Sequence, residues 1–348
     1  MIFRILPAAL LLIVLAAVAS ATSDSGTIRV AITENARAVE LRGADIAVTE
    51  TGGCEACPLR TWRTDVVRVA VNGAGLEVEG RRASALRLVS ERPIRLNGRE
   101  YVGRLDVLRN GDGALVVIND LPLEDYLVGV LRAESSERWP AEALRAQAIA
   151  SRTYAAYHRA LNAAKPYHIV ASTTHQQFAG RVAPTSPAWT AVQETAGQIL
   201  RWEGELFPAF YHANSGGFTE DPRTVFAARN MPALRPVVCS LATGSPHFQW
   251  ALDLRLDDVS ELLKRGNAGV GAVRSIEVTE RTATLRATVV TVHGTTGTQR
   301  LRGNEFRRIL GYDTLKSTLF AVAVDGELAR FSGRGFGGHG DDGEVDLA

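Results

Sequence analysis

The stretch LEDYLVGVLRAESSERWPAEALRAQAIASRTYAAYH, residues 123–158, decides the fold of the central part of this chain. From Leu123 its apolar residues recur at i, i+3, i+4, i+7 and i+8, which is one face of an amphipathic helix. A second segment begins at Pro140, a residue that suits the first helical position, and its many alanines add little bulk. The stretch therefore predicts two successive helices. The second ends near Asn162, and other elements can approach this helix closely.

Glu134 lies where this apolar stripe calls for another core residue. It follows Val130 by four positions and Leu127 by seven, so it shares their face at the end of the first helix. Partial burial disfavours a charged carboxylate and raises its pKa toward the range of a general acid. The alternative is a purely structural glutamate paired with one of three arginines: Arg132, Arg138 or Arg152.

The other nearby carboxylates offer no assured partner for Glu134. Glu137 falls in the expected loop between the helices, where we expect it to be solvated. Glu124 and Asp125 begin the first helix, where they favour the helix dipole. Because no second carboxylate has a spacing that assures a paired glycosidase site, a one-carboxylate mechanism fits better if the chain cleaves carbohydrate.

Two polar runs are candidates for binding. The expected second helix carries a polar stripe, which is either a solvated face or a row of groups that bind sugar hydroxyl and N-acetyl groups. Its members are Gln147, Ser151, Tyr154 and His158, with Arg152 beside them. A later turn-forming run is also suited to polar ligands. Its candidate residues are His212, Asn214, Ser215, Gly216, Gly217 and Thr219.

The chain is β-rich on both sides of this centre. Short apolar runs separated by Asn-Gly and other turn signals fill residues 27–118, and a β-rich part with a short helix near 304–310 follows residue 250. Strands, then helices, then strands indicate an α+β fold, with antiparallel β-rich regions flanking a central helical pair that carries the active-site motif. The expected divisions are 1–21, 22–118, 119–250 and 251–348.

Residues 1–21 have the pattern of a signal peptide. Arg4 precedes an apolar run that ends at Ala19, and Ala19-Ser20-Ala21 supplies a small-x-small cleavage pattern. The run is short for a bilayer-spanning helix, so we expect a membrane association only if this segment stays uncleaved. We therefore expect an exported protein that is periplasmic, bound to the cell wall or extracellular.

The net charge of +1 gives no sign of a polyanionic partner, so we expect no nucleic-acid binding. Cys54 and Cys57 lie in a Gly- and Pro-flanked loop, where export favours a small structural disulfide over a redox pair or half of a zinc site. Cys239 is then left over. We expect no cofactor.

Three motifs carry a resemblance to a known family. Residues 122–131, Glu134 and residues 139–155 closely resemble the signature of the stage II sporulation protein D / LytB (SpoIID/LytB) family. Residues 211–220 are similar to its second motif, and residues 301–320 contain a likeness to its C-terminal element. The resemblance extends from about residue 110 to 335, which makes 119–250 the expected catalytic core.

The resemblance implies a protein that acts on peptidoglycan. Sporulation protein D-like members are lytic transglycosylases that cut glycan strands at N-acetylmuramic acid, in cell-wall remodelling or sporulation. The family's catalytic glutamate maps onto Glu134, and its helix arginine onto Arg152, in substrate binding or in setting the Glu134 pKa. LytB-like members enhance a cell-wall amidase, so the alternative is a non-catalytic peptidoglycan-binding modulator with an amidase as partner.

Two departures from the family pattern affect these expectations. Some relatives bind zinc near the second motif, but here that motif carries Asn214 and Ser215 and no cysteine, so we expect no metal site. The family's glycine-rich end is altered around His339 and continues into acidic residues. We expect a truncated or frameshifted C-terminal end.

Overall fold

The computed structural model describes residues 26–51, 60–225 and 231–337. The expected signal peptide, the Cys54–Cys57 pair and the glycine-rich end around His339 lie outside these residues.

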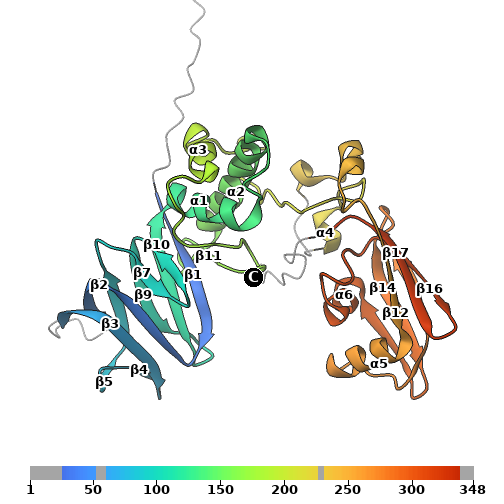
Figure 1. Cartoon of the computed structure of the whole chain (residues 1–348), viewed down its shortest axis with the longest axis horizontal. Helices are drawn as coiled ribbons and strands as arrows, with labels where there is room; N and C mark the ends of the chain where they lie inside the picture. Colours follow the sequence, from blue (N-terminus) through green and yellow to red (C-terminus); the bar gives the residue numbers. More distant parts are fainter. Residues whose placement is uncertain (1–25, 52–59, 226–230, 338–348) are drawn as a thin grey trace, which may run out of the picture.

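The described residues form two bodies, each with its own hydrophobic core (Figure 1). The first core collects residues from Ile28 to Val192, and the second collects residues from Trp250 to Phe331. The first core thus contains residues on both sides of residue 118, where we expect a domain boundary. That boundary stays a prediction. The mixed composition and the antiparallel sheets confirm the α+β fold class.

A large sheet dominates the first body. Its strands alternate buried and exposed residues, as the turn-punctuated apolar runs predict. Their order is β11-β1-β10-β9-β6-β2-β3-β4-β5, with β7 paired to β2 and β8 to β7, and the pairing of β11 with β1 is parallel. The strands are β1 (Thr27–Ala36), β2 (Ala38–Thr51), β3 (Thr61–Asn72), β4 (Gly75–Val78), β5 (Arg81–Ala83), β6 (Ala85–Val89), β7 (Ile94–Leu96), β8 (Arg99–Tyr101), β9 (Arg104–Arg109), β10 (Leu115–Pro122) and β11 (Ile169–Val170).

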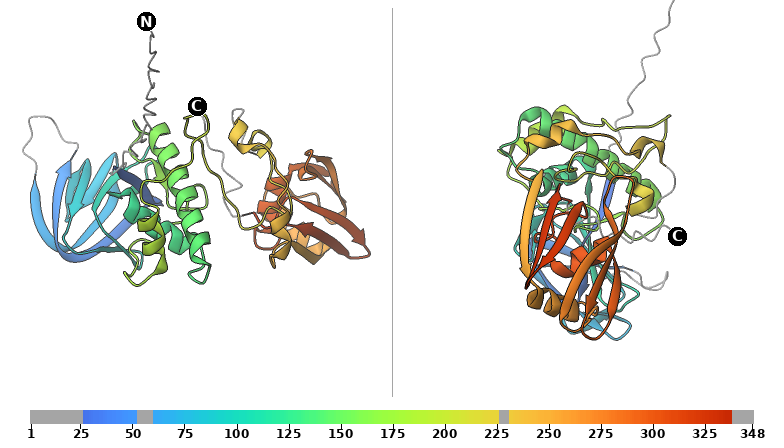
Figure 2. Two further views of the ribbon diagram at one scale, coloured as in Figure 1. Left: turned by 90° about the horizontal axis from the view of Figure 1, so that it is seen from above. Right: turned by 90° about the vertical axis from the view of Figure 1, so that its right-hand side faces the viewer.

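Three helices lie on the side of the sheet that faces the second body (Figure 2): the first two contact strand β1, and the third packs against the first two. They are α1 (Leu123–Glu134), α2 (Ala141–Leu161) and α3 (Pro187–Glu194). The first two confirm the helices expected from the sequence. The third was not predicted, although Ser186 caps it and Pro187 occupies its first turn.

Helix α1 is enclosed over most of its length, because Leu123 and all residues from Tyr126 to Leu131 are buried. It ends where Ser135 takes an extended conformation, so Glu134 is its last residue. Gly129 lets the helix approach its neighbours closely. A Cβ atom there would lie 2.3 Å from the Phe178 ring and 2.7 Å from the Gly180 carbonyl oxygen.

We therefore expect Gly129→Ala to lower the free energy of unfolding by about 1–3 kcal/mol, despite the higher helix propensity of alanine, because the added methyl group overpacks the core. Urea denaturation measures the change. Gly111→Ala is the matched control, since a Cβ there meets no atom within 4 Å. An unchanged urea midpoint for Gly129→Ala would show that the residues around α1 accommodate a methyl group at this position.

The second body contains two three-stranded antiparallel sheets, in the orders β12-β17-β16 and β13-β14-β15. Helices α5 and α6 contribute to its core, and α5 was not predicted. The elements are α4 (Pro222–Val225), β12 (Gln249–Arg255), α5 (Leu256–Arg265), β13 (Val273–Arg281), β14 (Ala287–Gly294), β15 (Thr298–Arg302), α6 (Gly303–Leu310), β16 (Phe320–Asp325) and β17 (Leu328–Arg334), with 3-10 turns at Pro232–Leu234 and Ser240–Gly244.

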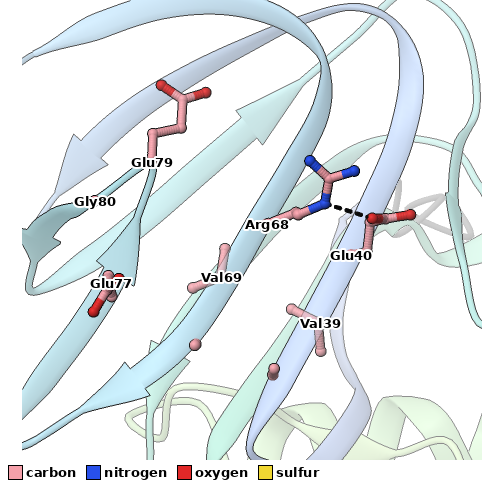
Figure 3. Close-up of a pocket in the computed structure, with 9 residues that line it drawn as sticks. Val39, Glu40, Arg68, Val69, Glu77, Glu79 and Gly80 are labelled. Carbon is pink, nitrogen blue, oxygen red and sulfur yellow. Dashed lines mark hydrogen bonds and ion pairs between the residues drawn. The ribbon is translucent and has the colours of Figure 1, made fainter.

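An open hollow lies on the first body between strands β2, β3 and β4 (Figure 3). Its charged groups are already engaged or exposed: the Arg68 Nε atom donates to Glu40 at 2.7 Å, and hydrogen bonds from Arg42 and then Arg68 lower the pKa of the exposed Glu40 carboxyl. The hollow lies at the end of the sheet away from α1, so it is separate from Glu134 (Figure 1).

Candidate active site

Glu134 is half-buried at the C-terminal end of α1. The backbone N–H of Gln177 donates a hydrogen bond to its Oε1 atom at 2.6 Å. Burial raises the pKa of the Glu134 carboxyl, and the Gln177 hydrogen bond opposes that rise. In the part of the chain that the structure describes, no arginine forms an ion pair with this carboxyl. The structure thus gives no support to the arginine-paired alternative.

Three tyrosines surround this carboxyl. Burial raises the pKa of Tyr126, Tyr154 and Tyr211 well above the ordinary range, and the Glu134 charge adds to each rise. These phenols therefore stay neutral at physiological pH. Neutral phenols place no positive charge beside the half-buried carboxyl, so they do not favour the loss of the proton from Glu134.

Arg152 does not contact Glu134. Its side chain is 1% exposed and forms a bidentate ion pair with Glu124, with contacts of 2.9 Å and 2.7 Å. The guanidinium also donates to the backbone carbonyls of Val192 and Gln198. Because Glu124 and Glu134 stand ten positions apart, about 15 Å along a helix, a side chain bound at the start of α1 is remote from its end. Arg152 thus connects α1, α2 and the residues around α3. Glu124 forms this ion pair in addition to its favourable position at the start of the helix dipole.

The polar stripe of α2 faces inward and is not a solvated face. Ser151, Tyr154 and His158 are at most 5% exposed, and Gln147 is half-buried with its amide donating to the Ser151 hydroxyl. The His158 ring packs against Tyr154 and against His175, at centroid distances of 4.3 and 4.9 Å. Among the described residues, neither ring nitrogen of His158 has a hydrogen-bond partner.

This histidine pair and His168 make the protein acid-sensitive. Burial lowers the pKa of His158 to about 3 and of His168 and His175 to about 4. Below the unfolded histidine pKa of about 6.5, the unfolded chain binds more protons than the folded one, so stability is complete above that pH and falls toward pH 4. Three such groups give a slope of about 4 kcal/mol per pH unit in that window.

We expect His158→Phe to lower this slope by about a third, because one of the three proton uptakes is removed. Urea unfolding between pH 4.5 and 7.5 measures it. His293→Phe is the control, since His293 lies in the second body with its ring bonded to Thr298, and this variant should keep the wild-type slope. A slope that does not change in His158→Phe would mean that other groups govern the acid sensitivity.

The second polar run straddles the two bodies. Tyr211 belongs to the first, where its hydroxyl accepts a hydrogen bond from the Gln176 amide at 3.1 Å. His212 and Ala213 are exposed, and Asn214 belongs to the second body through its pairing with Phe336. The run therefore places its first residue beside Glu134 and its remainder on the other body.

The remaining candidates of this run are held by the second body. The Asn214 amide donates to the Ala242 carbonyl, and the carbonyl of the buried Ser215 accepts from Arg286. The Thr219 hydroxyl accepts from the Val237 N–H at 2.8 Å. Gly216 and Gly217 have φ angles of 70° and 105°, which other residues rarely adopt. These residues shape a loop whose exposed members are His212, Ala213 and Phe218.

Four residues near Glu134 were not among the sequence candidates: Tyr126, Gln176, Gln177 and Tyr211. Gln176 is fully buried, and its side chain bonds to both Tyr126 and Tyr211. Tyr126 lies on the apolar stripe of α1 and looked like core. The two glutamines lie in a loop-rich segment without periodicity, so their approach to Glu134 depends on tertiary contacts.

No group of three or more His, Cys, Asp or Glu side chains in the described residues could hold a metal ion. Cys239 is half-buried and free. No helix within the described ranges has the length and apolar character that a membrane crossing requires.

Two family models match the chain. Residues 111–202, which include α1, α2 and Glu134, match the stage II sporulation protein (SpoIID) model. Residues 240–341 match a domain of unknown function (DUF8618). The run from Tyr211 to Thr219 lies between the two matches.

The chain is also similar to curated proteins. An uncharacterised protein of Brachyspira hyodysenteriae is 36% identical over 47% of this chain and 45% of its own length. The amidase enhancer of Bacillus subtilis is 26% identical over 62% of this chain and 28% of its own length. The stage II sporulation protein D of Bacillus amyloliquefaciens is 26% identical over 64% of this chain. The chain spans 66% of that relative's length.

Proposed function

Because the chain belongs to the SpoIID family through residues 111–202, we propose that it is a peptidoglycan lytic transglycosylase with Glu134 as its one catalytic carboxyl group. The observation that carries the proposal is the state of this carboxyl. It is half-buried, it has no arginine partner among the described residues, and burial raises its pKa. A carboxylic acid that keeps its proton closer to neutral pH is what a general acid requires.

In the first step, the neutral Glu134 gives its proton to the glycosidic oxygen next to N-acetylmuramic acid. The bond between that oxygen and the anomeric carbon breaks, and the electron pair leaves with the protonated oxygen. Positive charge develops on the sugar ring while Glu134 becomes a carboxylate. That carboxylate lies close enough to stabilise the charge.

In the second step, the 6-hydroxyl of the same sugar attacks the anomeric carbon and gives its proton to Glu134. The product carries a 1,6-anhydro ring, and the acid is restored. Because the nucleophile belongs to the substrate, no second carboxylate is needed to activate water. The neighbouring carboxylates have other partners: Glu124 binds Arg152, and Glu137 accepts from the Ser186 hydroxyl at 2.7 Å.

The proposed substrate is the glycan strand, and the proposed place of action is outside the cytoplasm, in the periplasm or cell wall. The exposed residues His212 and Ala213 follow directly on Tyr211, so a strand that reaches Glu134 would run past this loop. Recognition would then involve groups of both bodies.

The direct test is incubation of the purified protein with intact peptidoglycan and with peptidoglycan freed of stem peptides by an amidase, followed by mass spectrometry. We expect anhydro-muramyl ends from at least one substrate. If neither yields cleaved strands, the transglycosylase proposal fails.

A second candidate function is a non-catalytic modulator of a cell-wall amidase. The likeness to the amidase enhancer of Bacillus subtilis favours it. The same assay distinguishes the two functions when an amidase is added. Faster release of stem peptides without any cleavage of glycan strands would support the modulator.

A further inference from the structure

Gln176 occupies the centre of the hydrogen-bond network beneath Glu134. Its side chain is 0% exposed. The Tyr126 hydroxyl donates to its Oε1 atom at 3.1 Å, while its Nε2 atom donates to the Ser151 carbonyl at 3.3 Å and to the Tyr211 hydroxyl at 3.1 Å. The carbonyl oxygen and the amide nitrogen are both engaged, so the side chain has one available orientation.

This orientation fixes the next peptide unit. The N–H that binds Glu134 belongs to Gln177, so it lies directly after the Cα atom of Gln176. A side chain bonded to α1 through Tyr126 and to α2 through Ser151 holds that peptide against both helices. The loop around Gln177 is irregular, and the residues after it are held separately: the Phe178 carbonyl accepts from Arg99, and the Ala179 N–H donates to the Gly129 carbonyl of α1.

We propose that Gln176 is a positioning residue, which fixes the Gln177 N–H against Glu134 Oε1 and so leaves Oε2 as the oxygen that carries the catalytic proton. In a neutral carboxyl group the carbonyl oxygen is the better hydrogen-bond acceptor, and the other oxygen holds the proton. The N–H at 2.6 Å therefore selects Oε1 as the carbonyl oxygen. The inference rests on the proposed function for the use of that proton, but the network itself does not depend on it.

Tyr211 extends this network to the second polar run. Its hydroxyl is held by the Gln176 amide, and three residues later the chain enters the second body at Asn214. Glycan binding to that run is thereby connected with the peptide unit whose N–H binds the Glu134 carboxyl group. Tyr211→Phe removes the hydrogen bond with the Gln176 amide, together with the one between Tyr211 and the Ser151 side chain, and keeps the ring.

The first test is the pH profile of glycan cleavage. Gln176→Leu keeps the approximate volume but loses all three hydrogen bonds of the side chain. We expect kcat to fall about tenfold and the alkaline limb of the profile to move to higher pH, because a weaker Gln177 hydrogen bond favours the neutral acid. Tyr211→Phe should move the limb in the same direction by less.

The matched control is Asn119→Leu. Asn119 is also fully buried, and its amide donates to backbone carbonyls of Val102 and Arg104 on a neighbouring part of the sheet. It should lose stability but keep the wild-type pH profile. An alkaline limb that stays in place in Gln176→Leu, as it should in the control, would overturn the positioning role.

The second test does not depend on activity. A double-mutant cycle combines Gln176→Leu with Glu134→Leu and measures unfolding at pH 8, where the carboxyl is charged. If Gln176 acts through the Glu134 hydrogen bond, its substitution should change the folding equilibrium constant about tenfold less in the Glu134→Leu background. Strict additivity would contradict the inference even if glycan cleavage is confirmed. Strong coupling without any cleavage would leave the inference standing and refute the transglycosylase.

Discussion

Glu134→Gln is expected to lower the rate of anhydro-muramyl end formation by about a thousandfold, within the range that general acids contribute. The amide keeps the size of the side chain and an acceptor for the Gln177 N–H, but it has no proton to give to the glycosidic oxygen. Mass spectrometry of the glycan products over time measures the rate. The fold should persist, because the substitution removes a charge that burial disfavours.

Glu137→Gln is the matched control for this prediction. Glu137 lies three residues further along, its side chain is 38% exposed, and it contacts Ser186 and Arg132. It should cleave at the wild-type rate. Equal rates for the wild type and Glu134→Gln would remove Glu134 from the catalytic role.

Arg152→Leu is expected to lower the free energy of unfolding by about 3 kcal/mol, the cost of breaking a buried pair. The loss leaves Glu124 without its cation, and it removes donors from the carbonyls of Val192 and Gln198. Urea denaturation at pH 7.5 measures the change.

The double variant Arg152→Leu/Glu124→Leu is the control for the pair itself. Replacing both charges leaves no isolated carboxylate, so it should be more stable than Arg152→Leu alone. If Arg152→Leu instead keeps full stability and loses affinity for glycan strands, the substrate-binding role expected from the family resemblance is the correct one.

The helical centre could be predicted because its signal is local. The apolar stripe of α1 repeats at helical spacing, and continuing it by one turn places Glu134 at the inner end of the helix. The structure has the helix ending at that residue. The partial burial expected from that position is present, and burial raises the pKa of the Glu134 carboxyl.

The partners of the helices could not be predicted, because they lie far apart in the sequence. Arg152 contacts Glu124 across 28 positions, and spacing alone does not distinguish that carboxylate from Glu134 on the same helix. Gln176 and Tyr211 come from segments without periodicity, and only the folded chain brings them together. Helix α3 is different, since Ser186 and Pro187 are start signals that the sequence does contain.

The central claim is that one carboxyl group, Glu134, cleaves the strand with the sugar's own hydroxyl as nucleophile. Cleavage in water enriched in oxygen-18 tests it most directly, because mass spectrometry then reads the origin of the oxygen at each new end. We expect 1,6-anhydro ends without the heavy isotope. Reducing ends that carry oxygen-18 would mean that water is the nucleophile, and would contradict the mechanism proposed for Glu134.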